Sequence, residues 1–343
     1  MKLLNEYTVV PPEMLECGAE KLHALLGGPS LFYLEGRRSP PLFITVLQHG
    51  NEPTGFDALQ RVLKRYQTRE LPRSVWIFIA NVKAAAVGRR VLEDQTDYNR
   101  AWPGTVAPHT VEAALMQQVI RKVTERPLFA SIDLHNNTGC NPHYGCVNEL
   151  DTPFLHLASL FARTVVYFRL PVGVQSLAMS EHCPAVTLEC GQAGENAALE
   201  HACEFIDACL HLHHIPEHPV AARDVNLLKT LATVKMNPGV SFGYEPGKHD
   251  VCFRRDLDHF NFGLLEKASV LAELKPGAFS GEALPTAVTN EAGDAIAADF
   301  FEILDNRLVA KRDIIPSMAT LDVNVIRQDC LFYVMEKMDF PMR

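Results

Sequence analysis

Apolar runs alternate with amphipathic stretches between residues 41 and 192, and this alternation predicts strands that alternate with helices. The run PLFITVLQ leads through the turn HGNEPTG into the amphipathic stretch GFDALQRVLKRYQ, and the run SVWIFIAN follows. Three later apolar runs are LFASIDLHN, TVVYFRL and PAVTLECG. Predicted helices at 110–125 and 152–163 precede the first and second of them, and one at 195–214 follows the third. A β-α-β order of this kind is typical of an α/β fold in which helices flank a sheet.

The two ends of the chain have different patterns. Residues 13–26 predict a helix, and LFYLEG after them predicts a strand. From about residue 220, short alternating runs such as LATVKM, SVLAEL and RLVAKRDI are separated by Pro, Gly, Asn and Asp, which predicts short strands. We therefore predict an α/β domain over residues 1–218 and a smaller β-rich domain over residues 219–343.

Composition narrows the class of protein. The chain has 343 residues, of which 47% are hydrophobic, so it can fill a large core. It has neither the roughly 18 consecutive apolar residues of a spanning helix nor the apolar segment of a secretory signal, which predicts a cytoplasmic protein without a membrane partner. The net charge of −9 and the absence of a basic block argue against nucleic acid as a partner, whereas homo-oligomerisation is left open.

The nine cysteines are scattered and form no CxxC pair, so we expect reduced thiols and no zinc knuckle. Cys140 and Cys190 adjoin the polar motifs described below, and a thiol enzyme is therefore one alternative.

Two imidazoles and a carboxylate follow apolar strands. His49 and Glu52 stand at positions i and i+3 directly after one strand, and His135 follows another. Ligands bind at the carboxyl ends of strands in open α/β sheets, so we expect these side chains to converge. Two His and one carboxylate with an open fourth position are the ligands of catalytic zinc, and we predict one zinc ion per chain. The alternatives are an exposed turn for the HxxE pair and a core histidine for His135.

Glu189 follows the apolar run AVTL and is our candidate general base and acid. Zinc lowers the pKa of a bound water toward about 7, but a separate carboxylate must still take and deliver the proton. A strand-end carboxylate shielded by apolar residues suits this role. The alternative is a capped or salt-bridged carboxylate.

The loop GRRVLEDQTDYNRAWPG contains candidate substrate contacts at Arg89, Arg90, Asn99 and Arg100. Arginine binds carboxylates in a bidentate manner, and a neighbouring Asn can bind a carboxylate or polarise a carbonyl. The alternative is that Arg89 and Arg90 are solvated and pair with Glu93 or Asp94. In the C-terminal domain, Tyr244 is a further candidate substrate contact.

Taken in order, HGNEPTG, NVKAAAVGRR with DYNRAWPG, SIDLHNNTG and TLECGQ resemble the motifs of the zinc carboxypeptidase superfamily, most closely its succinylglutamate desuccinylase/aspartoacylase branch. The resemblance covers roughly residues 40–195 and implies a zinc-carboxypeptidase-like mixed sheet flanked by helices, followed by a smaller β-rich domain. It implies His49, Glu52 and His135 as zinc ligands and Glu189 as the residue that activates water. It also implies that Asn99 and Arg100 contact the substrate carboxylate and that an upstream arginine, Arg90 or Arg89, polarises the scissile carbonyl.

The sequence departs from the branch at three positions. In the family an arginine precedes the Asn-Arg pair at a fixed spacing, and this position is Leu92 here. Arg90 or Arg89 can fill the role of that arginine only if this loop has two extra residues. Met179 stands where aspartoacylases have a second substrate arginine, and TNEAGDAIAADF lacks their late tyrosine. We therefore predict a zinc-dependent amide hydrolase that acts on an N-acyl amino acid or a similar small carboxylate-bearing amide. We do not expect acetylaspartate to be its substrate. The alternatives are a zinc carboxypeptidase for peptides, a catalytically silent zinc protein and a metal-free module that binds acidic metabolites.

Overall fold

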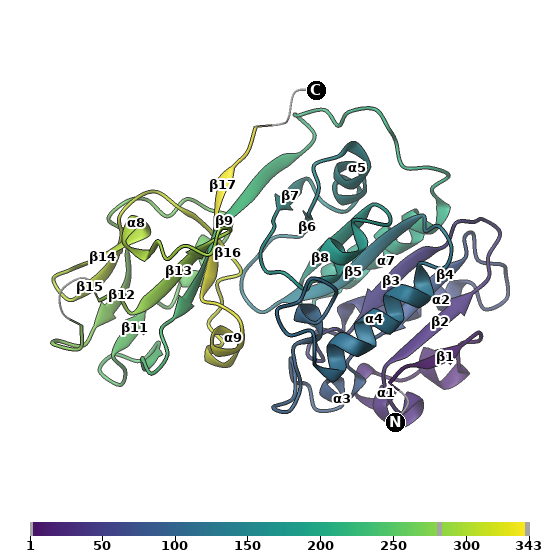
Figure 1. Cartoon of the computed structure of the whole chain (residues 1–343), viewed down its shortest axis with the longest axis horizontal. Coiled ribbons are helices and arrows are strands. Elements are labelled where there is room, and N and C mark those ends of the chain that lie inside the picture. The colour runs from purple at the N-terminus through teal and green to yellow at the C-terminus, as the bar shows by residue number, and fades with distance from the viewer. Residues whose placement is uncertain (1–2, 280–282, 340–343) are drawn as a thin grey trace. The chain divides into compact units, whose positions relative to one another are not determined.

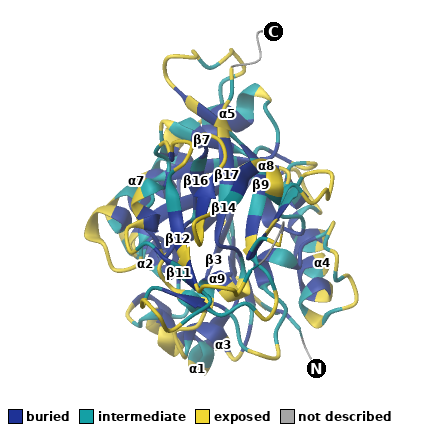
Figure 2. Cartoon of the chain, turned by 90° about the vertical axis from the view of Figure 1, so that its left-hand side faces the viewer, coloured by how far each residue is buried: buried dark blue, intermediate teal, exposed yellow. Residues whose placement is uncertain are grey.

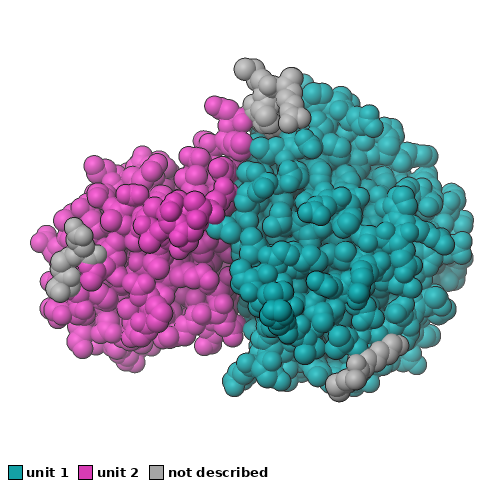
Figure 3. All heavy atoms as spheres, in the orientation of Figure 1, with its two compact units in different colours: residues 1–136, 143–227, 340–343 teal, residues 137–142, 228–339 magenta. Residues whose placement is uncertain are grey.

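The computed structural model describes residues 3–279 and 283–339. Contacts between residues divide the chain into two compact units, which Figure 3 shows in different colours. Residues up to 136 and from 143 to 227 form unit 1, and residues 137–142 join residues 228–339 in unit 2. The segment 137–142 therefore packs with the C-terminal part of the chain. The predicted domain boundary after residue 218 stays a prediction.

Unit 1 is built on a mixed sheet with the strand order β1-β2-β4-β3-β5-β8-β6-β7 (Figure 1). β3 is parallel to both β4 and β5, whereas β2 with β4 and β6 with β8 are antiparallel. The strands are β1 (Asn5–Tyr7), β2 (Ser30–Leu34), β3 (Leu42–Val46), β4 (Val75–Ile79), β5 (Ala130–Asn137), β6 (Tyr144–Val147), β7 (Thr164–Tyr167) and β8 (Ala185–Gln192). The predicted α/β class with a mixed sheet flanked by helices is confirmed.

The central strands are buried along nearly their whole length, which explains their sequences. All of β3, LFITV, is buried, and β3 lies in the dark blue interior of Figure 2. Strands covered by helices on both faces need such uninterrupted apolar runs. β5 and β8 are equally buried yet contain Asp133, His135 and Glu189. Buried polar groups require partners, so these side chains indicate a site rather than ordinary core.

Helices cover this sheet, and their ends follow local sequence signals. In α2 the apolar side chains of Phe56, Leu59 and Val62 are buried. The basic residues Lys64 and Arg65 lie in the last turn, where positive charges interact favourably with the helix dipole. α2 packs against α7. The α-helices of this unit are α1 (Leu22–Leu26), α2 (Thr54–Arg65), α3 (Val82–Ala85), α4 (Val111–Val123), α5 (Thr152–Phe161), α6 (Gln175–Met179) and α7 (Asn196–His211).

Some predicted elements were wrong. The helix predicted over 13–26 is divided into two 3-10 helices, η1 (Pro12–Leu15) and η2 (Ala19–Lys21), and the short α1. Gly18 has an extended conformation between them, so no continuous helix forms. The predicted loop 82–109 contains α3 and η3 (Tyr98–Arg100), and the sequence did not predict β1, β6 or α6.

Unit 2 is rich in strands, as predicted for the C-terminal part. β9 (Asn226–Met236) pairs with β13 (Thr286–Asn290) and β17 (Phe332–Lys337), and β17 pairs with β16 (Ile315–Ser317). A second sheet has the order β10-β11-β12-β15-β14, made of β10 (Phe242–Gly243), β11 (Val251–Phe253), β12 (Val270–Leu274), β15 (Arg307–Ala310) and β14 (Phe301–Leu304). The short helices are η4 (Leu257–Phe260), α8 (Ala297–Phe300) and α9 (Val323–Gln328). Aromatic pairs such as Phe242 with Phe253 and Phe301 with Phe332 pack in its core.

None of the helices among residues 3–279 and 283–339 is both long and apolar enough to cross a bilayer.

Candidate metal centre

Three neighbouring strands of unit 1 bring the predicted residues together. β3, β5 and β8 are adjacent in the sheet; His49 follows β3, His135 lies on β5 and Glu189 lies on β8. The sequence placed His135 and Glu189 at strand ends, and the structure puts both inside their strands, near the carboxyl ends. The sheet thus gathers residues that are far apart in the sequence, as expected at the carboxyl edge of parallel strands.

The turn after β3 has a tightly constrained backbone. Leu47 has a φ of 58°, a left-handed conformation that is unfavourable for a branched residue, and its carbonyl accepts a hydrogen bond from the amide of Asn81 at 2.7 Å. A Cβ at Gly50 would lie 2.1 Å from the backbone nitrogen of Ala85, so only glycine allows the turn to approach α3. These constraints fix the direction in which His49 and Glu52 leave the sheet.

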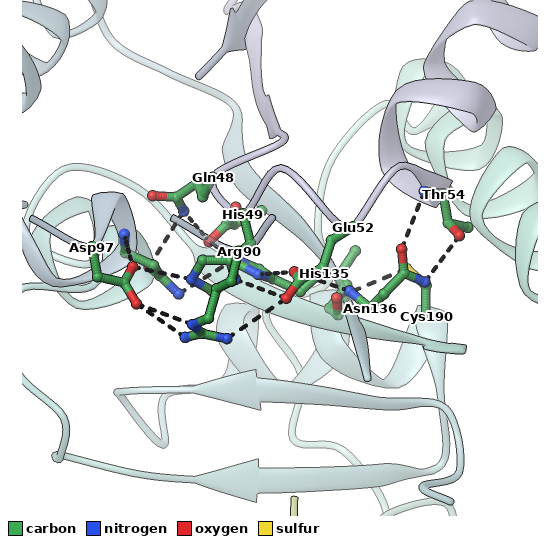
Figure 4. A network of polar contacts seen from close by, with 12 residues as sticks. Gln48, His49, Glu52, Thr54, Arg90, Asp97, His135, Asn136 and Cys190 are labelled. Carbon is green, nitrogen blue, oxygen red and sulfur yellow. Dashed lines mark hydrogen bonds and ion pairs between the residues drawn. The ribbon is translucent and has the colours of Figure 1, made fainter. Parts of the chain in front are cut away.

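Glu52 lies between the two imidazoles (Figure 4). Its Oε1 is 2.8 Å from Nδ1 of His49, and its Oε2 is 2.8 Å from Nδ1 of His135. The two rings meet edge to face with centroids 5.0 Å apart, and all three residues are buried. One potential ligand atom from each residue lies within 4.8 Å of the others, so the three side chains could bind one ion.

A carboxylate contacts the other nitrogen of each imidazole. Nε2 of His49 is 3.0 Å from Oδ1 of Asp97, and Nε2 of His135 is 2.9 Å from Oδ2 of Asp133. When each Nε2–H donates to its carboxylate, each Nδ1 presents a lone pair toward Glu52. Outer carboxylates of this kind orient metal-ligating histidines. The donor set therefore fits a divalent metal such as zinc, and a pair of ordinary core histidines would not need this second layer.

The local charges favour a cation. Burial raises the pKa of Glu52, but the positive charges of His49 and His135 outweigh burial and hold it well below its usual range. Burial lowers the pKa of His135, but Asp133 and Glu52 outweigh it, so the pKa lies well above the ordinary histidine value. The buried carboxylates that raise the pKa of His135 provide the negative potential that a metal ion requires, and a bound ion would take the place of the imidazole protons.

The structure separates the roles of the two candidate arginines. Arg90 is 8% exposed, its Nη2 donates to Oδ2 of Asp97 at 3.0 Å, and its Nη1 is 3.8 Å from Oε1 of Glu52. Figure 4 shows its guanidinium between Asp97 and Glu52. Arg89 is exposed and pairs with Glu93 at 3.7 Å, as the solvated alternative predicted for it. Arg90 is thus the arginine that contacts the candidate metal centre.

Asn99 also reaches the centre. Its Nδ2 lies 3.3 Å from Nε2 of His135, and its Oδ1 accepts from Nε2 of Gln48 at 3.3 Å. Gln48 in turn donates to Asp133 at 2.6 Å and accepts from the indole N–H of Trp102 at 2.6 Å. Nη1 of Arg100 donates to the backbone carbonyl of Asn99 at 2.8 Å, which ties Arg100 to the same loop.

Glu189 is buried in β8 beside these charges. Burial raises its pKa to about 7, opposed in part by the positive charges of His135 and His49. Its Oε2 is buried and has no hydrogen-bond partner in the described part of the chain. A carboxyl group whose pKa is near neutrality and whose oxygen is unpaired can both accept and return a proton near pH 7.

This pKa predicts a stability effect in the metal-free protein. A carboxyl with a folded pKa near 7 and an unfolded pKa near 4.5 holds more protons when folded, so ionising it costs stability as pH rises from 4.5 to 7. The free energy of unfolding of Glu189→Gln, relative to that of the parent, should therefore rise by about 3 kcal/mol between pH 4.5 and pH 8. Urea unfolding of both proteins across this range measures the difference, with Glu200→Gln as the control, because the Glu200 side chain is exposed. A difference that does not change with pH would contradict the raised pKa.

Sequence reasoning missed Asp97 and Gln48, which orient the site from outside. Asp97 falls in the motif DYNR but carries no pattern that links it to His49 far upstream.

Tyr244 belongs to unit 2, where its hydroxyl donates to the backbone carbonyl of Thr320 at 2.8 Å. Its role as a substrate contact stays a prediction.

The profile of the succinylglutamate desuccinylase/aspartoacylase catalytic domain matches residues 39–211. A search of curated proteins found no significant match.

Solved structures share the fold at low sequence identity. The succinylglutamate desuccinylase of Chromobacterium violaceum is 14% identical with a TM-score of 0.57, and the match covers 90% of this chain and 87% of that one. A succinylglutamate desuccinylase/aspartoacylase from Rhodobacter sphaeroides is 16% identical with a TM-score of 0.57, over 89% and 88% of the two chains. Murine aminoacylase 3 is 14% identical with a TM-score of 0.53, over 88% and 97%.

Proposed function

Because the chain belongs to the succinylglutamate desuccinylase/aspartoacylase family, we propose that it is a zinc-dependent hydrolase of small amides. The substrate is an N-acyl amino acid or a similar amide that carries a carboxylate. One zinc ion per chain is held by His49, Glu52 and His135, and Glu189 moves the protons.

The observation that carries this proposal is the double layer around the imidazoles. Both Nδ1 atoms face Glu52 at 2.8 Å, while Asp97 and Asp133 contact the Nε2 atoms. Three protein ligands that leave a further position open are typical of catalytic zinc, whereas structural zinc has four.

The chain's own residues would divide the reaction between them. When bound, zinc supplies a Lewis acid that polarises a carbonyl and lowers the pKa of water. Glu189 takes a proton from the attacking water as the oxygen–carbon bond forms, and the guanidinium of Arg90 donates hydrogen bonds to the developing oxyanion. Glu189 then returns the proton to the amide nitrogen as the carbon–nitrogen bond breaks, and transfer of the second water proton leaves a carboxylate and an ammonium group.

Substrate selection would rest on the loop that carries Asn99 and Arg100. A guanidinium next to a side-chain amide provides several donors for a carboxylate. We propose that Arg100 and Asn99 bind the carboxylate of the amino-acid part. Met179 stands where aspartoacylases have a second substrate arginine, so an amino-acid part without a second carboxylate is favoured.

The experiment is a substrate panel. The zinc-loaded protein is incubated with N-acetyl and N-succinyl amino acids and with dipeptides that have a free C-terminus, and amine release is measured. We expect an N-acyl amino acid to be the best substrate and chelation followed by zinc addition to abolish and restore turnover. Preference for dipeptides would replace the acylase by a carboxypeptidase, and no turnover of any member would favour a catalytically silent zinc protein.

A cytoplasmic location stays a prediction of the sequence, which leaves homo-oligomerisation open.

A further inference from the structure

We propose that unit 2 contains a second metal site, formed by Cys140, Asp258 and His259, for a thiophilic divalent cation such as zinc. One potential ligand atom from each of these residues, Sγ of Cys140, a carboxylate oxygen of Asp258 and a ring nitrogen of His259, lies within 4.8 Å of the others. All three residues belong to unit 2, because the segment 137–142 packs with the C-terminal part of the chain (Figure 3).

Asp258 is the buried member of this cluster. It is 7% exposed, and its Oδ2 accepts a hydrogen bond from the backbone amide of Cys140 at 3.4 Å. Its other oxygen, Oδ1, is buried without a hydrogen-bond partner among residues 3–279 and 283–339. A buried, unpaired carboxylate oxygen is costly, and a metal ion beside Cys140 and His259 would remove that cost.

The backbone holds Cys140 in position from both sides. A Cβ on Gly139 would lie 1.9 Å from the carbonyl oxygen of Ala319, so the chain passes too close for any other residue. On the other side, Oδ1 of Asn141 accepts from the amide of Met318 at 3.0 Å. The thiol therefore projects from a fixed backbone.

Asp258 and His259 are fixed by the same neighbouring segment. They lie on η4, and Asn261 directly after it donates to the carbonyl of Ala319 at 2.8 Å and accepts from its amide at 2.9 Å. The two short segments that supply the ligands are thus both anchored to Ala319 or its neighbour Met318.

The ligand types select the metal. A thiolate with an imidazole and a carboxylate suits borderline-soft zinc, whereas hard ions such as magnesium prefer oxygen ligands alone. Binding deprotonates the Cys140 thiol, and the proton passes to the buffer. Cys140 is also the one cysteine of the nine, all of them in the described residues, that is exposed, so an ion can reach it from solvent.

The two sites differ in chemistry, which makes the second one measurable by itself. The site of His49, Glu52 and His135 has only nitrogen and oxygen ligands, whereas the second site has the sulfur of Cys140. Cobalt bound by a thiolate has a near-ultraviolet charge-transfer band that nitrogen and oxygen ligands do not produce. A cobalt titration of the metal-free full chain therefore reports the second site regardless of whether the protein hydrolyses any substrate.

We expect two equivalents of cobalt per chain and a thiolate band that zinc displaces. Cys140→Ser should remove the band and one equivalent, and Asp258→Asn should weaken the band. The matched control is Cys252→Ser, a half-buried cysteine of unit 2 outside the cluster, which should keep the band. In a Glu52→Ala, His135→Ala protein, the band should remain with one equivalent.

Two results would overturn the proposal. One is the absence of a thiolate band in the parent at saturating cobalt. The other is a band that persists in Cys140→Ser. If Cys140→Ser does not fold, alkylation of Cys140 in the parent replaces it: zinc must slow iodoacetamide labelling at Cys140, identified by peptide mass, and equal labelling with and without zinc would also reject the site.

Discussion

Glu189→Gln should keep its zinc and lose kcat/KM on the best N-acyl amino acid by about 10²- to 10⁴-fold, the usual effect of losing a general base. The substitution preserves the size of the side chain but removes its ability to take and return a proton. The parent carboxyl is suited to this because burial raises its pKa to about 7 and its Oε2 is free of hydrogen bonds in the described residues. Amine release and bound zinc are measured on the same preparation.

Glu200→Gln on α7 is the matched control, because its carboxylate is exposed and pairs with Arg61. It should be as active as the parent. If Glu189→Gln holds zinc and turns over substrate at the parent's rate, another group is the base and the assignment of Glu189 is wrong. If it loses zinc as well, metal loss accounts for the inactivity, and the test must be repeated at saturating zinc.

Arg90→Lys should lower kcat/KM by about 10²- to 10³-fold, the range found when one donor to a developing oxyanion is removed. Lysine keeps the positive charge between Glu52 and Asp97 but cannot reproduce the planar fork of donors. The loss should appear mainly in kcat, because the contact is made most strongly with the transition state. Steady-state kinetics on the same substrate measure it.

Arg89→Lys is the control at the neighbouring position, since Arg89 is exposed and contacts Glu93. It should behave as the parent in both kcat and KM. Thermal melting and zinc content of the Arg90 variant show whether its fold and metal are intact. Equal losses in the two variants would mean that neither arginine acts specifically, and a larger loss in Arg89→Lys would reverse the assignment.

Much of the α/β organisation follows from local patterns. Continuous apolar runs such as LFITV become strands buried on both faces, and the amphipathic run around Phe56 becomes α2, because burial of apolar side chains determines both elements. Residues 13–26 are an exception: their helical pattern does not show that Gly18 is extended and separates η1 from η2 and α1.

The sequence by itself selected His49, Glu52, His135 and Glu189 as candidates, because they follow three separate apolar runs that were predicted to lie in one sheet. Only the tertiary structure decided that Arg90, and not Arg89, contacts Glu52, since adjacent loop residues point in different directions and no periodicity distinguishes them. It also supplied Asp97 as the partner of His49, a contact across 48 residues of sequence. The order of apolar and polar residues in a segment indicates which of its side chains are buried. A contact between distant loops depends on how the sheet is ordered, and no short stretch of sequence contains that order.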